Sequence, residues 1–106
     1  MAWFFLIIAG LLEVVWAYSM KKSAGFTLLV PSIVTLVTML GSFALLALAM
    51  RSLPLGTAYT IWTGIGAVGA FLLGITFLGE AVTPLRLIAA LLIISGIVAM
   101  KLGGGN

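Results

Sequence analysis

Residues 2–20 read AWFFLIIAGLLEVVWAYSM, an apolar run interrupted by one charged residue, Glu13. A helix of about 20 apolar residues spans the hydrocarbon core of a bilayer, and in such a helix Glu13 lies near the midplane. An ionised carboxylate at that depth costs several kcal/mol on any scale. Glu13 must therefore be protonated, paired with a cation or exposed to a water-filled cavity.

The rest of the sequence has the same apolar character. Of its 106 residues, 64% are hydrophobic and 7% are charged, whereas about 25% of residues are charged in a typical soluble domain. The apolar runs predict an all-α integral membrane protein with four transmembrane helices, over residues 2–20, 27–50, 55–78 and 84–102. The whole chain, residues 1–106, is then expected to be one membrane domain, because the spans leave no room for a soluble one.

The charged residues and the missing residue types exclude several classes of protein. The net charge is +3, but the five basic residues stand at the ends of the apolar runs, as interfacial anchors do, and form no cluster for nucleic acid. The chain lacks Cys and His, so we expect no disulfide, no thiolate catalysis, no cofactor and no metal. A single buried carboxylate without His, Cys or Asp offers too few partners for an enzyme active site.

The loop charges indicate that two copies could assemble in opposite orientations. If the four spans alternate, Arg51 and Lys101 lie on one side of the membrane, and Lys21, Lys22 and Arg86 lie on the other. A difference of one charge, 3 − 2, is a weak bias under the positive-inside rule, so the chain is expected to insert both ways round. Two antiparallel copies would form the inverted repeat that larger transporters carry within one chain.

The residues one helical turn from Glu13 indicate a cation site. Ala9, Gly10 and Ala17 are small enough to let a ligand or another helix approach, and Trp16 supplies an aromatic wall. In an antiparallel dimer the two Glu13 carboxylates could converge, and each would then bind either a proton or a cation. Such competition gives antiport if the shared site opens to each side of the membrane in turn. The alternative is a structural carboxylate that accepts hydrogen bonds from a neighbouring helix.

Polar residues of the second span share one helix face. Thr35, Thr38 and Ser42 recur at spacings of three and four residues. Their hydroxyls could contribute to a site, or they could donate to carbonyls of their own helix, as Ser and Thr often do in membranes. Ser42, which follows Gly41, is the preferred site residue of the three.

The third span is too polar and too rich in glycine to face only lipid. It carries Tyr59 and Trp62 together with several threonines, so it should face a cavity or another helix. Its glycines predict a bend between Gly64 and Gly69. Tyr59 could instead be an interfacial anchor, and Trp16 and Trp62 could serve in packing alone.

The fourth span begins with a capping signal. Thr83 followed by Pro84 is typical of an N-cap and the first helical residue after it. Gly96 would let another helix approach closely, so this helix is expected to face lipid or to make a dimer contact. The last residues, 103–106, read GGGN and predict a frayed end.

Three stretches resemble a known family, the small multidrug resistance family of four-helix transporters. They are residues 12–16 (LEVVW), the turn at 23–26 (SAGF) and residues 53–69 (LPLGTAYTIWTGIGAVG), and the resemblance covers essentially the whole chain. It implies an antiparallel homodimer of dual topology in the bacterial plasma (inner) membrane, in which Glu13 of each subunit binds protons and a cationic substrate in competition. Trp16 and Met39 resemble the guanidinium exporter branch, because exporters of polyaromatic cations carry a small residue and a tyrosine there.

The resemblance also implies roles for individual residues. By it, Ser42 orients the Glu13 carboxylate, and Tyr59 contacts that carboxylate and shifts as access alternates. The other positions that it singles out line the pocket (Gly10, Trp16, Trp62), bend the third helix (Gly64, Gly66, Gly69) or lie in the helix of the dimer contact (Gly96).

These observations predict a proton-coupled antiporter that exports guanidinium and small substituted guanidiniums. Guanidinium is permanently charged at physiological pH and donates paired N–H groups in the geometry that a carboxylate accepts. Two alternatives stay open. One is a broad exporter of quaternary ammonium or polyaromatic cations, and the other is one subunit of a paired, heteromeric transporter.

Overall fold

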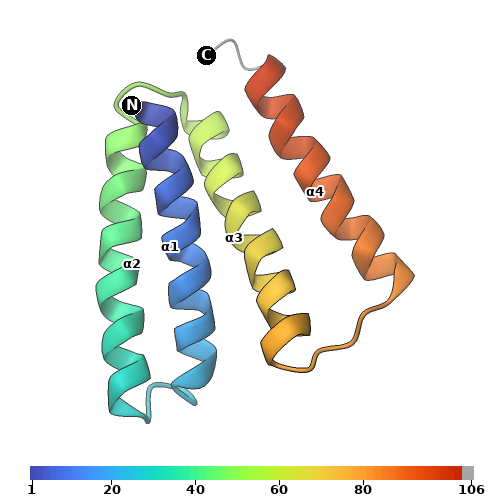
Figure 1. The fold of residues 1–106 in the computed structure, drawn as a ribbon. Helices are drawn as coiled ribbons and strands as arrows, with labels where there is room; N and C mark the ends of the chain where they lie inside the picture. The colour runs from blue at the N-terminus through green and yellow to red at the C-terminus, as the bar shows by residue number, and fades with distance from the viewer. Residues whose placement is uncertain (104–106) are drawn as a thin grey trace.

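The computed structural model describes residues 1–103 and consists of four long helices (Figure 1). They are α1 (Ala2–Lys22), α2 (Leu29–Ala49), α3 (Leu55–Phe77) and α4 (Pro84–Gly103). Each is long and apolar enough to cross a membrane. The prediction of an all-α chain with four membrane-spanning helices is therefore confirmed, whereas most of the expected frayed end, residues 104–106, lies outside the described residues.

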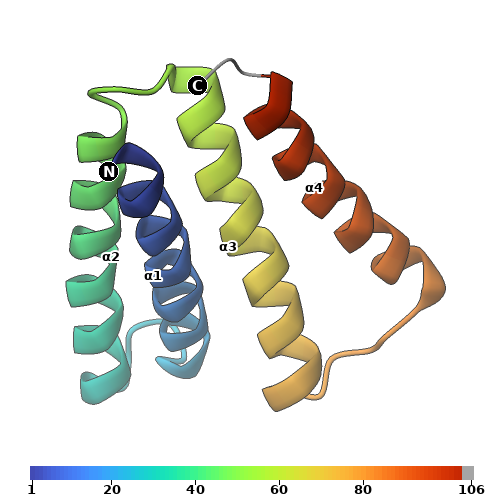
Figure 2. The same ribbon diagram turned by 45° about the horizontal axis from the view of Figure 1, so that its top comes forward.

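Helix α1 lies between α2 and α3, and α4 stands apart from this group of three. In the described part of the chain α4 packs on α3, Lys101 near the end of α4 also lies over the Trp3 ring of α1 at 5.1 Å from its centroid, and none of the residues of α4 is buried. Both ribbon views show α4 diverging from α3 toward the α3–α4 loop (Figures 1 and 2). One chain thus leaves a whole transmembrane helix without a buried residue.

The tightest packing lies in the half of the bundle that contains the chain's N-terminus and the α2–α3 loop. Leu6 and Ile61 are the largest apolar side chains that are fully buried there. Around them lie the other buried apolar residues of the core: Ala9, Leu46, Ala49, Leu53, Ala58 and Trp62. Most other large apolar side chains are exposed, as expected for surfaces that face lipid.

The turn between α1 and α2 moves the start of α2 to Leu29, two residues later than the expected residue 27. Ala24, Gly25 and Phe26 all adopt left-handed backbone angles, with φ of 51°, 76° and 67°. Helix cannot continue through such residues. The buried Ser23 holds this turn, because its hydroxyl donates to the Met20 carbonyl and accepts from the Phe26 amide.

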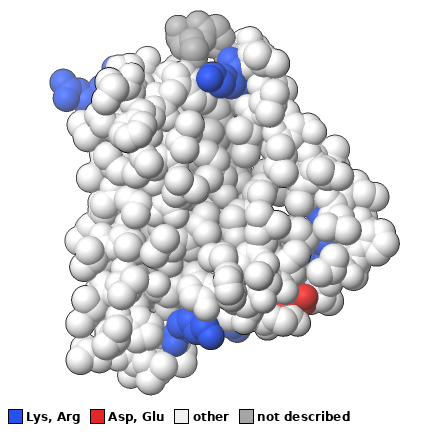
Figure 3. All heavy atoms as spheres, viewed as in Figure 1, with Lys and Arg blue, Asp and Glu red and all other residues white. Residues whose placement is uncertain are grey.

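The start of α4 follows the predicted capping signal. The Arg86 amide donates to the Thr83 hydroxyl at 3.2 Å, which makes Thr83 the side-chain cap of the helix that begins at Pro84. The capping prediction is confirmed. The charged atoms visible in Figure 3 lie around the edge of the molecule, and the broad central face between them carries none. That distribution suits a protein whose middle is surrounded by hydrocarbon.

Candidate functional site

Glu13 projects from the middle of α1 toward α3 and lies directly against Gly66. A Cβ at Gly66 would overlap the Glu13 carboxylate, so only glycine leaves room for it there. The next glycine on α3, Gly69, receives Val14 in the same way. The contact between α1 and α3 therefore positions the carboxylate at the centre of the span.

Two buried polar atoms beside this contact have no hydrogen-bond partner among the described residues. They are Oε1 of Glu13 and Nε1 of Trp16, which lies three residues further along α1. Buried polar groups in proteins are nearly always hydrogen-bonded, and those without a partner need an explanation. The carboxylate oxygen can accept an N–H donor of a cation, whereas the indole N–H can only donate and would have to bond to an acceptor such as a carboxylate.

Ser42 lies beside this site but makes its hydrogen bonds elsewhere in the single chain. Its fully buried hydroxyl donates to the Ala9 carbonyl at 2.7 Å and accepts from Nε1 of Trp62 at 2.9 Å. Ala9 precedes Glu13 by one turn, so its carbonyl also accepts the Glu13 amide within α1. Ser42 on α2 thus links α1 and α3 by hydrogen bonds next to Glu13. The expected hydrogen bond from Ser42 to the Glu13 carboxylate is not present among the described residues.

Four aromatic rings form a continuous wall across α1, α2 and α3. Trp16 contacts Phe43 with ring centroids 6.2 Å apart, and Phe43 contacts Trp62 at 5.8 Å. Tyr59 packs on Trp62 at 5.6 Å. The structure thus brings together the three predicted aromatic residues and adds Phe43, for which the sequence held no signal beyond its place next to Ser42. Such rings suit a cation, because their faces carry partial negative charge.

The other predicted glycines are sites of close helix packing. A Cβ at Gly10 would lie 2.7 Å from Cγ2 of Ile65, so Gly10 receives an α3 side chain and does not open into a cavity in the single chain. A Cβ at Gly64 would lie 2.8 Å from Cδ1 of Ile97 on α4. Helix α3 is continuous through Gly64, Gly66 and Gly69, and these glycines give close access to α4 or α1.

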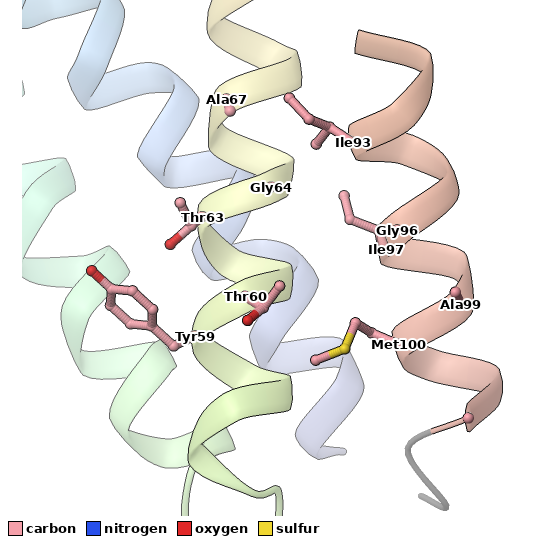
Figure 4. Close-up of a pocket in the computed structure, with 11 residues that line it drawn as sticks. Tyr59, Thr60, Thr63, Gly64, Ala67, Ile93, Gly96, Ile97, Ala99 and Met100 are labelled. Carbon is pink, nitrogen blue, oxygen red and sulfur yellow. The ribbon is translucent and has the colours of Figure 1, made fainter. Parts of the chain in front are cut away.

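A large hollow lies between α3 and α4, and Glu13 is not among the residues that line it (Figure 4). It has a volume of about 760 Å³ and is lined largely by apolar groups of the two helices. Gly96 faces it with no atom within 4 Å of a Cβ built there, and Tyr59, half exposed, lies at its edge with its ring turned away from α4. No hydrogen bond between Tyr59 and Glu13 exists among residues 1–103.

Thr35 and Thr38 take the structural role that the sequence left open. The Thr35 hydroxyl donates to the Pro31 carbonyl at 2.7 Å, and the Thr38 hydroxyl donates to the Val34 carbonyl at 2.6 Å. Both bonds stay within α2, as expected for threonines in a membrane helix. The preference for Ser42 over these two residues agrees with this geometry.

Comparison with known proteins gives a consistent result. Residues 1–94 match the family model described as Small Multidrug Resistance protein. Proteins named Guanidinium exporter from Escherichia coli (strain K12), Citrobacter freundii and Salmonella typhimurium are each 57% identical to the chain over 102 residues. The alignments cover 96% of this chain and 97% of each relative, so the similarity extends through all four helices.

Proposed function

Since the chain belongs to the small multidrug resistance family, we propose that it is a proton-coupled antiporter that exports guanidinium and small substituted guanidiniums. The observation that carries this proposal is the Glu13 carboxylate, which is seated on Gly66 at mid-membrane with Oε1 buried and unpartnered in the described chain. The chain is a multi-pass membrane protein, and we place it in the bacterial plasma membrane. The cation crosses unchanged, so no catalytic residue is assigned.

The chemistry of guanidinium supports this choice of substrate. A carboxylate accepts two parallel N–H groups from a planar guanidinium, and such charge-assisted pairs are among the strongest hydrogen bonds in proteins. The aromatic wall beside Glu13 offers ring faces to the same cation. The names of the 57% identical relatives, guanidinium exporters, support the same choice.

The transporting unit is proposed to be an antiparallel homodimer of dual topology. Its support is that α4 has no buried residue and that Gly96 faces open space in one chain. Two Glu13 carboxylates would then share one site, with Tyr59 reaching it from the partner and Ser42 turning its hydroxyl toward the carboxylate. A bend of α3 at its glycines, of which Gly66 lies nearest the site, would alternate the access.

Competition at this shared site couples the two fluxes. A desolvated carboxylate is costly when ionised and unpaired, so the empty and deprotonated state is disfavoured. The site therefore changes its access from one side to the other only when each Glu13 carries a proton or a share of the cation. Entry of protons from one side then expels guanidinium to the other.

The proposal is tested by transport currents from purified protein in liposomes, with guanidinium, a phenyl-bearing guanidinium and a tetraalkylammonium as substrates. We expect guanidinium currents that disappear in Glu13→Gln, because the amide carries no charge and exchanges no proton. Thr38→Val is the matched control, since the Thr38 hydroxyl bonds only to carbonyls of its own helix. Accumulation of guanidinium by Glu13→Gln against its gradient would refute the proposal.

The same experiment separates the two alternatives. Larger currents with the tetraalkylammonium than with guanidinium would assign the chain to the broad exporters of hydrophobic cations. No current with any cation, in liposomes shown to contain dimers, would indicate a chain that needs a second, similar subunit.

A further inference from the structure

Arg86, near the start of α4, holds its own guanidinium group in a small cluster at the α3–α4 loop. Nη2 lies 3.4 Å from Oε1 of Glu80, and Nη1 donates to the Ala81 carbonyl. The guanidinium carbon lies 5.0 Å from the centroid of the Phe71 ring on α3. A carboxylate, a carbonyl and an aromatic face are the groups that recognise a guanidinium ion, and here a side chain of the protein occupies them.

Glu80 is held on α3 in the same manner as Glu13. A Cβ at Gly74 would lie 2.6 Å from Oε1 of Glu80, and the Glu80 amide donates to the Gly74 carbonyl at 3.0 Å. Gly66, the seat of Glu13, lies eight residues earlier on α3, which corresponds to about 12 Å along the helix axis. Both acidic residues of the chain thus rest on glycines of one helix, one in mid-membrane and one near the helix end.

Glu80 also lies where the seam between α1 and α3 reaches the end of the molecule. A cavity of about 150 Å³ at that end is lined by Tyr18 and Lys21 of α1, by residues near the end of α3, and by Glu80. The same seam holds Glu13 against Gly66 further inside. Among the described residues Glu80 is the one carboxylate at this end of the molecule, so a cation that approaches this end from water meets it there, beside Lys21.

We propose that Glu80 is an outer site for the transported guanidinium, which Arg86 occupies when no substrate is present. This rests on the proposed function, because a guanidinium substrate carries the same group as the Arg86 side chain. The side chains of Arg86 and Glu80 are 40% and 44% exposed, and ion pairs this open to water are weak and exchange readily. An arriving guanidinium replaces Arg86 at Glu80 without any change in covalent bonds and then moves on to Glu13.

The test compares the Michaelis constants of Glu80→Gln and Arg86→Lys for guanidinium in the liposome assay. Glu80→Gln removes the outer site, so we expect KM to rise about two- to fivefold, the scale of an exposed ion pair, with little change in maximal rate. Arg86→Lys keeps the positive charge that influences orientation, but lysine lacks the planar fork and competes less well for Glu80. We therefore expect its KM to fall by a similar factor, and we expect the double variant to behave like Glu80→Gln.

A purely structural ion pair predicts a different pattern. If the Arg86–Glu80 pair only stabilises the loop, Glu80→Gln and Arg86→Lys would shift KM or the maximal rate in the same direction. Shifts in the same direction, or no shift in either variant, would therefore overturn the outer site. If Arg86→Lys inserts poorly, Arg86→Gln with its orientation measured provides the same comparison. Failure of the transport proposal is distinguishable, because wild-type protein would then give no guanidinium current or would keep it in Glu13→Gln.

Discussion

Replacement of Gly66 by alanine places one methyl group where the structure seats the Glu13 carboxylate. Oε1, Cδ and Cγ of Glu13 would all lie within 3.0 Å of the new Cβ, whereas ordinary contacts begin near 3.4 Å. The carboxylate must therefore move by roughly 1 Å, because van der Waals repulsion does not allow the overlap. A displacement of that size in a positioned group can lower a rate by about 100-fold.

The effect on folding is expected to be smaller than the effect on transport. The carboxylate is the far end of a flexible side chain, so it can swing away from α3 without separating the helices. Gly69→Ala is the opposite case, because its Cβ would meet the stiff, β-branched Val14 close to the backbone. Overpacking of that kind costs about 1–3 kcal/mol of stability. Gly56→Ala is the control, since nothing lies within 4 Å of a Cβ there.

The assay measures guanidinium current in liposomes and thermal unfolding in detergent for all three variants. We expect Gly66→Ala to lose at least about 10-fold in current while its unfolding temperature stays within a few degrees of wild type. Gly69→Ala should unfold earlier, and Gly56→Ala should match or exceed the wild-type stability, because alanine favours helix. Wild-type current and KM in Gly66→Ala would show that the working carboxylate does not rest on Gly66, and the reasoning would be wrong.

Two further predictions concern packing and orientation. Ser42→Ala should lower the free energy of unfolding by about 1–3 kcal/mol, because it leaves the buried Trp62 indole N–H without an acceptor. Ser95→Ala is the control and should change it little, because the Ser95 hydroxyl bonds only within α4. Equal effects of the two substitutions would show that the Ser42–Trp62 hydrogen bond does not stabilise the fold. Moving one charge across the membrane with Lys22→Ala and Leu102→Lys should bias the orientation of the chain, measured by the accessibility of tagged ends. Unchanged accessibility would count against the charge-balance argument.

The helices were predictable because each is set by local sequence. Span length is fixed by runs of apolar residues, and the start of α4 at Pro84 by the preceding Thr83. The start of α2 was missed by two residues, because the left-handed Ala24 and Phe26 are unusual for side chains other than glycine. The residue types of this turn do not predict a left-handed backbone at Ala24 and Phe26. It is held by hydrogen bonds to Ser23 that form only when the turn closes.

The residues of the candidate site could be proposed from the sequence, but their contacts could not. Glu13 is singled out by the cost of a charge in hydrocarbon, which needs no knowledge of the fold. Its seat on Gly66 depends on how α1 and α3 are rotated against each other. Helices that are apolar all round carry no period that defines an inner face, so that rotation cannot be read from the sequence. The same reason hides Phe43 and the Ser42 bond to Ala9.

The carboxylates of Glu13 and Glu80 differ in whether a basic side chain of the protein is paired with them. Glu80 has a cation built into the chain, Arg86, but the pair lies at the surface where water weakens it and substrate can replace it. Glu13 has no basic partner among the described residues. A fixed arginine beside Glu13 would be held far more tightly in the membrane interior, where charges are poorly screened, and it could never leave. A buried carboxylate can exchange cations for protons only if no basic side chain of the protein is paired with it. None of the five basic residues of this chain lies near the middle of a span.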